Sequence, residues 1–262
     1  AEESRRWGVT LPERTPHILR RDEALSAPAA AHTVPSNVVR HSFIQMGVPA
    51  EKIHVIPYGV RLDRFAPAEP PPSDSFEVLF AGQIGLRKGV PYLLEAFARL
   101  RHPRKRLTLG RAVPKEFLPI LARLPMENVT IAGDISRDEL ARLMSRSHVL
   151  MLPSVEEGLA LVQGEAMACG CPVIATPATG SENLFTHGVE GFIVPDRDTN
   201  ALAGRLQQLA DDPALRERMS AAALQRIKFL GGWDQFGDQW DKLLHTLTGH
   251  PMDCTSTNEQ LR

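Results

Sequence analysis

Residues 148–176 read HVLMLPSVEEGLALVQGEAMACGCPVIAT, and this stretch decides the fold. Its two ends, HVLMLP and CPVIAT, are short apolar runs bounded by Gly or Pro, which is typical of buried parallel strands. The segment between them is rich in small and apolar residues, and a helix is expected to begin near Gly158. A strand, a helix and a second strand in direct succession predict a parallel βαβ unit.

The same alternation continues on both sides of this stretch. Four further runs have the length and composition of buried strands: FEVLFAG, RLTLG, NVTIAG and GFIVP. Helical patterns lie between them, with Pro91 suited to a first helical position and Ser136 and Glu139 suited to a capping box. We therefore expect an α/β fold, a doubly wound parallel sheet of the Rossmann type, over residues 76–230.

The front of the chain carries a smaller α/β pattern. AHTVPS and KIHVIPYG have the pattern of two strands, and a helical stripe lies between them. A single strand–helix–strand unit cannot bury both faces of its sheet. Residues 1–65 are therefore interpreted as the remnant of a second α/β domain. Because the chain opens with Ala1 rather than Met, the start of that domain is expected to lie upstream.

Three shorter segments complete the expected organisation. Residues 66–75, APAEPPPSDS, have the Pro-rich and acidic composition of a linker or an exposed loop. Residues 231–247 are expected to form a final helix. Residues 248–262 are polar and aperiodic, so we expect a loose tail.

Composition excludes several classes of protein. Lys and Arg number 30 and Asp and Glu 31, so no basic excess supports a nucleic-acid partner. No stretch reaches the roughly 18 apolar residues of a membrane span. Cys169 and Cys171 are one residue apart, which argues against both a disulfide framework and a zinc site. They are interpreted as small buried residues in a reducing compartment, so a cytoplasmic location is expected, with attachment to the membrane surface left open.

The segment that follows HVLMLP carries the strongest candidate site. In sheets of this kind, ligands bind beyond the carboxyl ends of the strands, and a helix that starts there points free N–H groups at the ligand. Glu157 lies at that end, and Gly158 and Ala160 are small enough to let a diphosphate come close. Glu165 lies two turns into an otherwise apolar helix, where a carboxylate without a partner would be costly to bury. Ribose hydroxyls would supply such a partner.

A second candidate is the turn in AGQIGLRKGVPYLLEAF, residues 81–97. It follows a strand, precedes a helix and carries Arg87 and Lys88, two cations that suit phosphate oxygens. The glycine spacing is neither that of a dinucleotide fingerprint nor that of a Walker motif. By itself the turn fits a solvated basic loop equally well.

These two segments resemble the retaining family-four glycosyltransferases, also called group-one glycosyltransferases, which have the GT-B architecture of two Rossmann-like domains. The family signature is E-G-F-G/S-L, then a second Glu, then A-M-A-C-G-x-P-V-I. Here it stands as Glu157-Gly158-Leu159-Ala160-Leu161, then Glu165 and AMACGCPVIA, with Leu for Phe and Ala for Gly or Ser. The resemblance covers roughly residues 32–245 and includes WDQFGDQWDKLL, which is similar to the helix that crosses back onto the N-terminal domain.

The resemblance also assigns the basic turn. The family has G-R-x-x-x-x-K-G there, with Arg and Lys on the donor diphosphate. Lys88 matches the Lys, whereas Gln83 stands at the position of the Arg. Arg87 is our candidate to supply the missing charge.

Two softer matches follow from the same resemblance. Ile135 lies where the family contacts the nucleobase, although an ordinary strand-to-helix loop fits equally well and Asp134 beside it has the character of a turn residue. Gly180, Ser181 and, with less weight, Glu182 resemble residues near the donor sugar. His187 is interpreted as a surface histidine.

Together the resemblance implies transfer of a sugar from a nucleotide-diphosphate sugar to an unidentified acceptor hydroxyl, with retention of configuration. Lys88 and Glu157 are the expected catalytic residues. The expected binding residues are Gln83, Arg87, Lys88, Ile135, Gly158, Ala160, Leu161, Val162 and Glu165. No metal and no cofactor are expected, and the acceptor is expected to bind a missing N-terminal domain.

Two alternatives stay open. The chain could be a nucleotide-sugar-binding module without activity, which would need the donor site but no acceptor site. It could also belong to another GT-B enzyme, such as a sugar-nucleotide epimerase or a phosphorylase. Turnover and product analysis separate these.

Overall fold

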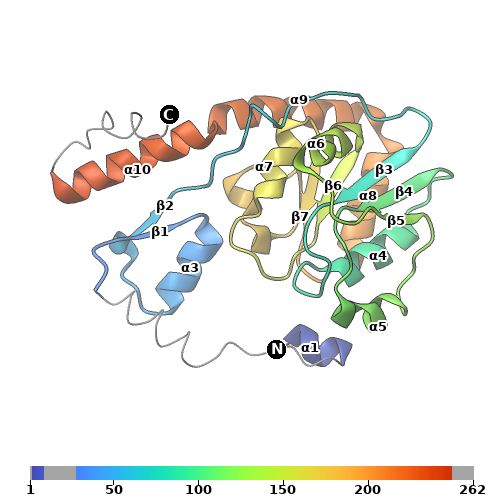
Figure 1. Ribbon diagram of the computed structural model, residues 1–262, viewed down its shortest axis with the longest axis horizontal. Coiled ribbons are helices and arrows are strands. Elements are labelled where there is room, and N and C mark those ends of the chain that lie inside the picture. Colours follow the sequence, from blue (N-terminus) through green and yellow to red (C-terminus); the bar gives the residue numbers. More distant parts are fainter. Residues whose placement is uncertain (1, 9–27, 250–262) are drawn as a thin grey trace.

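The computed structural model describes residues 2–8 and 28–249, and a parallel six-stranded sheet forms its centre (Figure 1). The strands are β3 (Phe76–Phe80), β4 (Lys105–Leu109), β5 (Val129–Ile131), β6 (Val149–Leu152), β7 (Val173–Ala175) and β8 (Gly191–Ile193). Their order across the sheet is β5-β4-β3-β6-β7-β8. The order reverses between β3 and β6, which is the switch point of a doubly wound sheet. The predicted fold class is confirmed.

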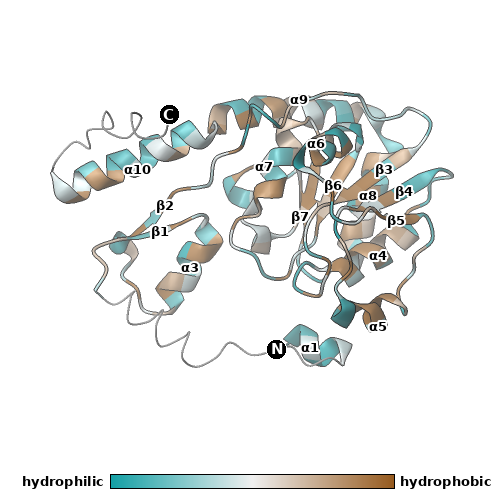
Figure 2. Cartoon of the chain, viewed as in Figure 1, coloured by the Kyte–Doolittle hydropathy of each residue, from teal (hydrophilic) through white to brown (hydrophobic). Residues whose placement is uncertain are grey.

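Helices cover both faces of this sheet. They are α4 (Val90–Arg99), α5 (Leu118–Leu121), α6 (Arg137–Arg146), α7 (Leu161–Ala168), α8 (Thr199–Asp211) and α9 (Pro213–Leu230). α4 packs against α8 on one face, and α7 packs against α6 and α9 on the other. The central strand β6 is buried along its whole length, and Figure 2 shows hydrophobic residues concentrated in the strands. This two-sided cover explains why β6 and β7 are continuous apolar runs. The edge strand β5 is largely exposed, so the prediction that its run NVTIAG is a buried strand was wrong.

Local sequence signals set several helix starts. Ser136 Oγ accepts a hydrogen bond from the Glu139 N–H at 3.1 Å, which caps α6 as the sequence predicted. The start of α7 differs from its prediction, because the helix begins at Leu161 rather than near Gly158. The backbone before it pairs with a neighbouring loop instead: the Ala160 N–H donates to the carbonyl of Thr179 at 3.1 Å.

The first unit is a two-stranded parallel sheet with one helix. β1 (His32–Val34) pairs with β2 (Ile53–Val55), and α3 (Asn37–Gln45) connects them. α3 has no buried residue, as expected of a unit that cannot cover both faces of its sheet. The short helix α1 (Glu2–Trp7) lies on the larger domain, a placement that the sequence did not predict. Glu3 is buried there, accepting from the hydroxyl of Tyr92 at 3.0 Å and from Nε of Arg197 at 2.6 Å.

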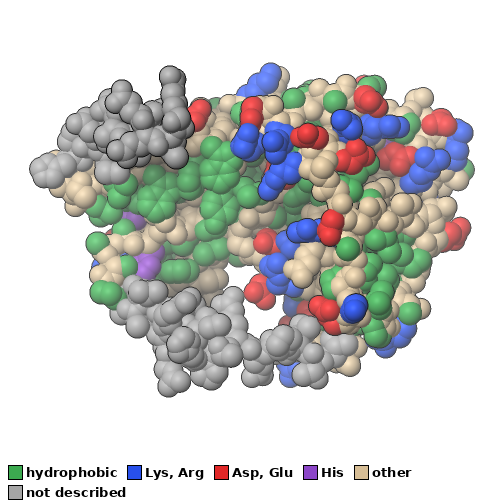
Figure 3. Space-filling model, in the orientation of Figure 1, with side chains coloured by type: hydrophobic (Ala, Val, Ile, Leu, Met, Phe, Trp, Pro, Cys, Tyr) green, Lys and Arg blue, Asp and Glu red, His purple; other side chains and the backbone are tan. Residues whose placement is uncertain are grey.

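The chain crosses between the first unit and the larger domain twice, and the two crossing segments lie side by side. Val60 forms a parallel bridge with Gly232, and a Cβ on Gly59 would lie 2.4 Å from the Gly232 carbonyl oxygen. After Gly232 the helix α10 (Trp233–Thr248) runs beside the first unit (Figure 1). Figure 3 shows hydrophobic side chains gathered in this area. Tyr58 stacks there on Trp233 with ring centroids 6.4 Å apart.

Several predicted domain boundaries can be located, although the division itself stays a prediction. β3 begins at Phe76 and α9 ends at Leu230, the two ends assigned to the larger domain. The predicted linker packs on the end of α6, because Ser145 Oγ accepts from Ala68 N–H at 3.1 Å and donates to the Ala66 carbonyl at 3.2 Å. Thr248, the first residue of the expected loose tail, is the last residue of α10, and residues 250–262 lie outside the described residues.

Candidate functional site

The two candidate loops meet at the switch point of the sheet. One follows β3 and the other follows β6, and the Val155 N–H donates to the Arg87 carbonyl at 2.9 Å. Gly89 has a φ of +68°, and a Cβ there would lie 1.9 Å from the carbonyl oxygen of Pro153. Only glycine fits this crossing, both for the left-handed backbone and for the contact. The fold therefore locks the basic turn against the segment that carries Glu157.

Lys88 and Glu157 form an ion pair at the centre of this junction. Lys88 Nζ donates to Glu157 Oε2, and the side chains are only 12% and 17% exposed. Arg87 Nη1 lies 3.5 Å from the same oxygen and donates to the Glu156 carbonyl at 3.2 Å. Two cations thus face one carboxylate, and this excess of positive charge suits an anionic ligand. Arg87, the candidate to supply the charge absent at Gln83, thus lies at the same carboxylate as Lys88.

Gln83 borders a cavity of about 210 Å³, together with Arg87, Lys88 and Phe117. It also borders a more open one of about 440 Å³, together with Arg111 and Asp134. Arg111 Nη1 donates to Asp134 Oδ1 at 3.3 Å, so the residue interpreted as a turn residue also holds a cation beside this opening.

Ile135 is close to the loop that follows β4. Its Cδ1 atom lies 3.2 Å from the position that a Cβ on Gly110 would occupy. The loops after β4 and β5 therefore touch, next to the opening that Gln83 borders. The nucleobase contact of Ile135 stays a prediction.

Glu165 is the buried carboxylate of the site. The residue is 9% exposed, and Arg137 Nη1 donates to its Oε1 at 3.3 Å. Burial raises the pKa of the Glu165 carboxyl above its ordinary value, and the Arg137 guanidinium opposes this shift. Sequence reasoning missed Arg137. Its signal was a cation in the first turn of a helix, where acidic residues are favoured.

The small residues of the site contact the protein itself. A Cβ on Gly158 would lie 3.3 Å from Val39, in the first unit. Gly180 has a φ of +70°, and a Cβ there would lie 2.7 Å from the Gly158 carbonyl oxygen. Ser181 is fully buried and its hydroxyl donates to the Thr176 carbonyl at 3.1 Å. Close packing within the protein therefore explains why Gly158 and Gly180 are glycines.

The remaining predicted positions divide into buried and exposed. Ala160 is buried, and Leu161 is 38% exposed at the start of α7. Val162 is partly buried against the core. Glu182 and His187 are exposed, as the sequence predicted for the histidine. Cys169 and Cys171 are buried and free, also as predicted, and burial raises the pKa of Cys169 to about 11.

The described residues offer no group of three or more His, Cys, Asp or Glu that could hold a metal ion. Within the same part of the chain, no helix has the length and apolarity needed to cross a membrane.

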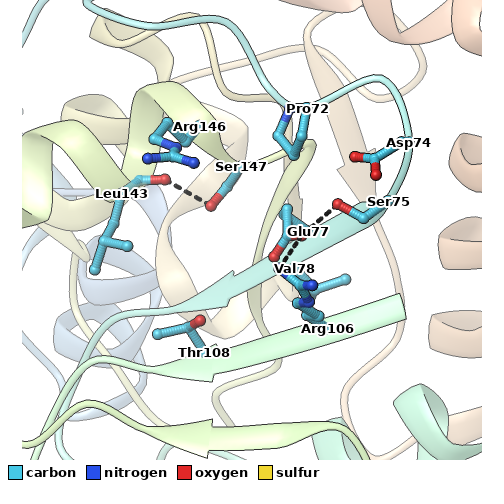
Figure 4. Close-up of a pocket in the computed structure, with 10 residues that line it drawn as sticks. All are labelled: Pro72, Asp74, Ser75, Glu77, Val78, Arg106, Thr108, Leu143, Arg146 and Ser147. Carbon is cyan, nitrogen blue, oxygen red and sulfur yellow. Dashed lines mark hydrogen bonds and ion pairs between the residues drawn. The ribbon is translucent and has the colours of Figure 1, made fainter. Parts of the chain in front are cut away.

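A separate polar pocket lies at the amino ends of β3 and β4, away from the switch point (Figure 4). Two carboxylates line it. Glu77 accepts from the Ser75 hydroxyl at 2.5 Å and lies 3.7 Å from Nη1 of Arg106. Asp74 lies 3.1 Å from Nη1 of Arg104. Another arginine on its rim, Arg146, pairs with Glu69 at 3.5 Å. The charges of this pocket are matched by the protein, in contrast to the excess of cations around Glu157.

Comparisons with known proteins match most of the chain. The family model described as Glycosyl transferases group 1 matches residues 63–226. The D-inositol 3-phosphate glycosyltransferase of Streptomyces avermitilis is 34% identical over 220 residues, which are 75% of this chain and 46% of that protein. The alpha-D-kanosaminyltransferase of Streptomyces kanamyceticus is 32% identical over 200 residues, 70% of this chain and 52% of that protein. The chain thus spans about half the length of these relatives.

Solved structures show the same arrangement. Sucrose-phosphate synthase from Thermosynechococcus elongatus superposes with a TM-score of 0.79 at 28% identity, covering 93% of this chain and 65% of that one. HepE from Anabaena, solved in complex with UDP and glucose, superposes with a TM-score of 0.78 at 22% identity, covering 89% and 68% of the two chains. The second likeness concerns the fold alone.

Proposed function

Because the chain belongs to the group 1 glycosyltransferases, we propose that it forms the donor-binding half of an enzyme that transfers a sugar from a nucleotide-diphosphate sugar to an acceptor hydroxyl, with retention of configuration. The observation that carries this proposal is the cluster at the switch point. Lys88 and Arg87 face Glu157 there, at the edge of the sheet where doubly wound folds bind their ligands.

The leaving diphosphate is the group that needs stabilisation. As the bond between the anomeric carbon and the diphosphate oxygen breaks, negative charge develops on that oxygen, and cations already in place lower the barrier. In the proposed mechanism Lys88 exchanges Glu157 for the β-phosphate, with Arg87 as the second cation. The N–H groups at the start of α7, near Leu161 and Val162, add the positive end of a helix.

Glu157 then gains a role of its own. Once Lys88 binds phosphate, the carboxylate is available to the hydroxyls of the donor sugar. The acceptor oxygen forms the new bond to the anomeric carbon, and its proton passes to a phosphate oxygen of the leaving group. The reaction as proposed uses neither a metal nor a cofactor.

Glu165 is proposed to hold the ribose. A buried carboxylate with one described ionic partner retains acceptor capacity, since an ionised carboxyl has about four lone-pair positions. Ile135, Gln83 and the opening beside them are proposed for the nucleobase and the adjoining phosphate, and Gly158 and Ala160 for close approach of the diphosphate.

The donor and the acceptor are proposed only as classes. HepE was solved with UDP-glucose, so uridine donors are the first to test, followed by guanosine and adenosine donors. The names of the relatives point to small polyhydroxylated acceptors such as an inositol phosphate. The whole protein is proposed to act in the cytoplasm, and the acceptor to bind a further N-terminal domain.

The test uses the chain described here and a longer form that includes the second domain. Calorimetric titration with UDP, GDP and ADP should give binding to at least one nucleotide, and assays with the matching sugar donors should give transfer by the longer form. Retention is read from the anomeric configuration of the product. Binding without transfer by the longer form would favour the binding module. An epimerised or phosphorolysed donor would favour another GT-B enzyme, and no binding to any nucleotide would refute the donor site.

A further inference from the structure

Ser36 joins the first unit to the loop that carries Glu157. The residue is fully buried at the start of α3, and its hydroxyl makes two hydrogen bonds. Oγ accepts from the Val39 N–H at 3.3 Å, which caps the helix, and donates to the Gly158 carbonyl at 2.7 Å. A helix cap needs only an acceptor, so the second bond is an addition that the capping role does not explain.

The surroundings of this bond are tightly packed. Gly158 follows Glu157 directly, and a Cβ on it would lie 3.3 Å from Val39 and 3.7 Å from Pro35. A Cβ on Gly180, in the loop after β7, would lie 3.0 Å from the Cβ of Ser36. The start of α3 therefore touches the carboxyl-end loops of two neighbouring strands.

A second hydrogen bond joins the start of α3 to the loop after β7. The Asn37 N–H donates to Oδ1 of Asn183 at 2.9 Å. The contact thus ties the start of α3 to the loops after both β6 and β7, through hydrogen bonds from two successive residues.

We propose that Ser36 is a positioning residue of the donor site: by holding the Gly158 carbonyl it fixes the backbone between Glu157 and the first turn of α7. The first unit would then serve the donor side of the site as well as the acceptor side. This inference rests on the proposed function, because the backbone in question is the one assigned to the diphosphate. The chemistry is specific to a hydroxyl, which donates to the carbonyl and accepts from the N–H at once.

The substitution Ser36→Gly separates the two roles. Glycine replaces serine at a helix cap at a cost of only a few tenths of a kcal/mol, about a twofold change in an equilibrium, but it cannot donate to Gly158. Ser36→Thr keeps the hydroxyl and should restore the wild-type behaviour. Asp198→Gly is the matched control, because Asp198 caps α8 by accepting from the Ala201 N–H at 2.8 Å and is part of neither candidate loop.

Two measurements test the proposal on the full chain. The first is hydrogen exchange of the backbone amides of residues 155–162, read by mass spectrometry without any ligand. The second is the ratio of affinities for a nucleoside diphosphate and the matching monophosphate, which isolates the β-phosphate. We expect Ser36→Gly to speed exchange of this peptide and to lower the affinity ratio about threefold to thirtyfold, as loss of one buried hydrogen bond implies. Ser36→Thr and Asp198→Gly should leave both unchanged.

Unchanged exchange of residues 155–162 in Ser36→Gly would overturn the proposal, as would equal losses for the two nucleotides without rescue by threonine. If the wild-type chain binds no nucleotide, the proposed function fails, but faster exchange confined to this peptide would still establish that Ser36 positions the loop.

Discussion

Glu157 and Glu165 belong to one short segment, yet the structure places them in opposite surroundings. Glu157 faces Lys88 and Arg87 in a loop, and one of these cations is as hidden from solvent as the carboxylate itself. Glu165 lies inside α7, and its described ionic partner, Arg137, is 64% exposed. The difference is that Glu157 pairs with two cations in a loop, whereas Glu165 is buried in a helix and its described ionic partner is largely exposed. Four experiments address this contrast.

The largest effect is expected from Glu165→Ala. If the carboxylate accepts two ribose hydroxyls, each bond to a charged acceptor contributes about 1.5–3 kcal/mol. Together the two bonds would contribute about 3–6 kcal/mol, so affinity for a nucleoside diphosphate should fall about a hundredfold to ten-thousandfold, measured by calorimetry. Glu139→Ala, which removes an exposed carboxylate from α6, is the control and should change little. An unchanged dissociation constant for Glu165→Ala would refute the ribose role.

Lys88→Ala should discriminate between ligands. The diphosphate loses a charge-assisted hydrogen bond, so its affinity should fall about tenfold to a hundredfold, while the bare nucleoside should lose little. Lys115→Ala removes an exposed lysine nearby and serves as the control. Arg87→Ala, at a more exposed side chain, should show a smaller loss of the same kind. Equal losses for both ligands would assign Lys88 to folding.

Glu165→Gln should separate stability from binding. The pKa of Glu165 is raised in the folded protein, so the folded state binds this proton more tightly than the unfolded state does. The buried charge therefore destabilises the fold above that pKa, and the penalty disappears as the pH falls through it. The variant should be more stable than the wild type at neutral pH, with the gain vanishing in acid, as thermal unfolding across pH 4–8 would show. A constant difference at all pH values would contradict this.

Arg137→Gln should have the smallest effect on nucleotide affinity at neutral pH, and it should change how that affinity depends on pH in acid. Without the guanidinium, burial raises the pKa of Glu165 further, so nucleotide affinity should begin to fall at a higher pH than in the wild type. At neutral pH we expect a loss of about threefold or less, because the ion pair is largely exposed on one side. Arg142→Gln, an equally exposed arginine on the same helix, is the control. Identical pH profiles for the two variants would rule out this role of Arg137.

The sequence predicted what depends on local pattern. The strands β6 and β7 are apolar runs between turn residues, and such runs indicate strands that are buried on both faces. Lys88 and Glu157 follow the ends of β3 and β6, so the switch point brings them together without further information. Their site roles stay predictions, but their proximity follows from the topology.

The sequence did not predict contacts between separate elements. Arg137 and Glu165 lie on different helices, and Ser36 meets Gly158 across the boundary of two units, with no periodicity relating either pair. The start of α7 was placed too early for the same reason. Its preceding backbone pairs with the loop around Thr179, a partner that a local pattern does not reveal.

The stability of α1 depends on its contact with the larger domain. Six residues are too few to be stably helical by themselves in water, so the helix depends on Glu3 and its partners Tyr92 and Arg197. Because α1 is covalently part of the chain, its docking avoids most of the translational and rotational entropy, about 4–15 kcal/mol, that a separate peptide would lose on binding. Detached from the chain, the same six residues would compete for this surface only very weakly, and removing them would uncover the Tyr92 hydroxyl and the Arg197 guanidinium together.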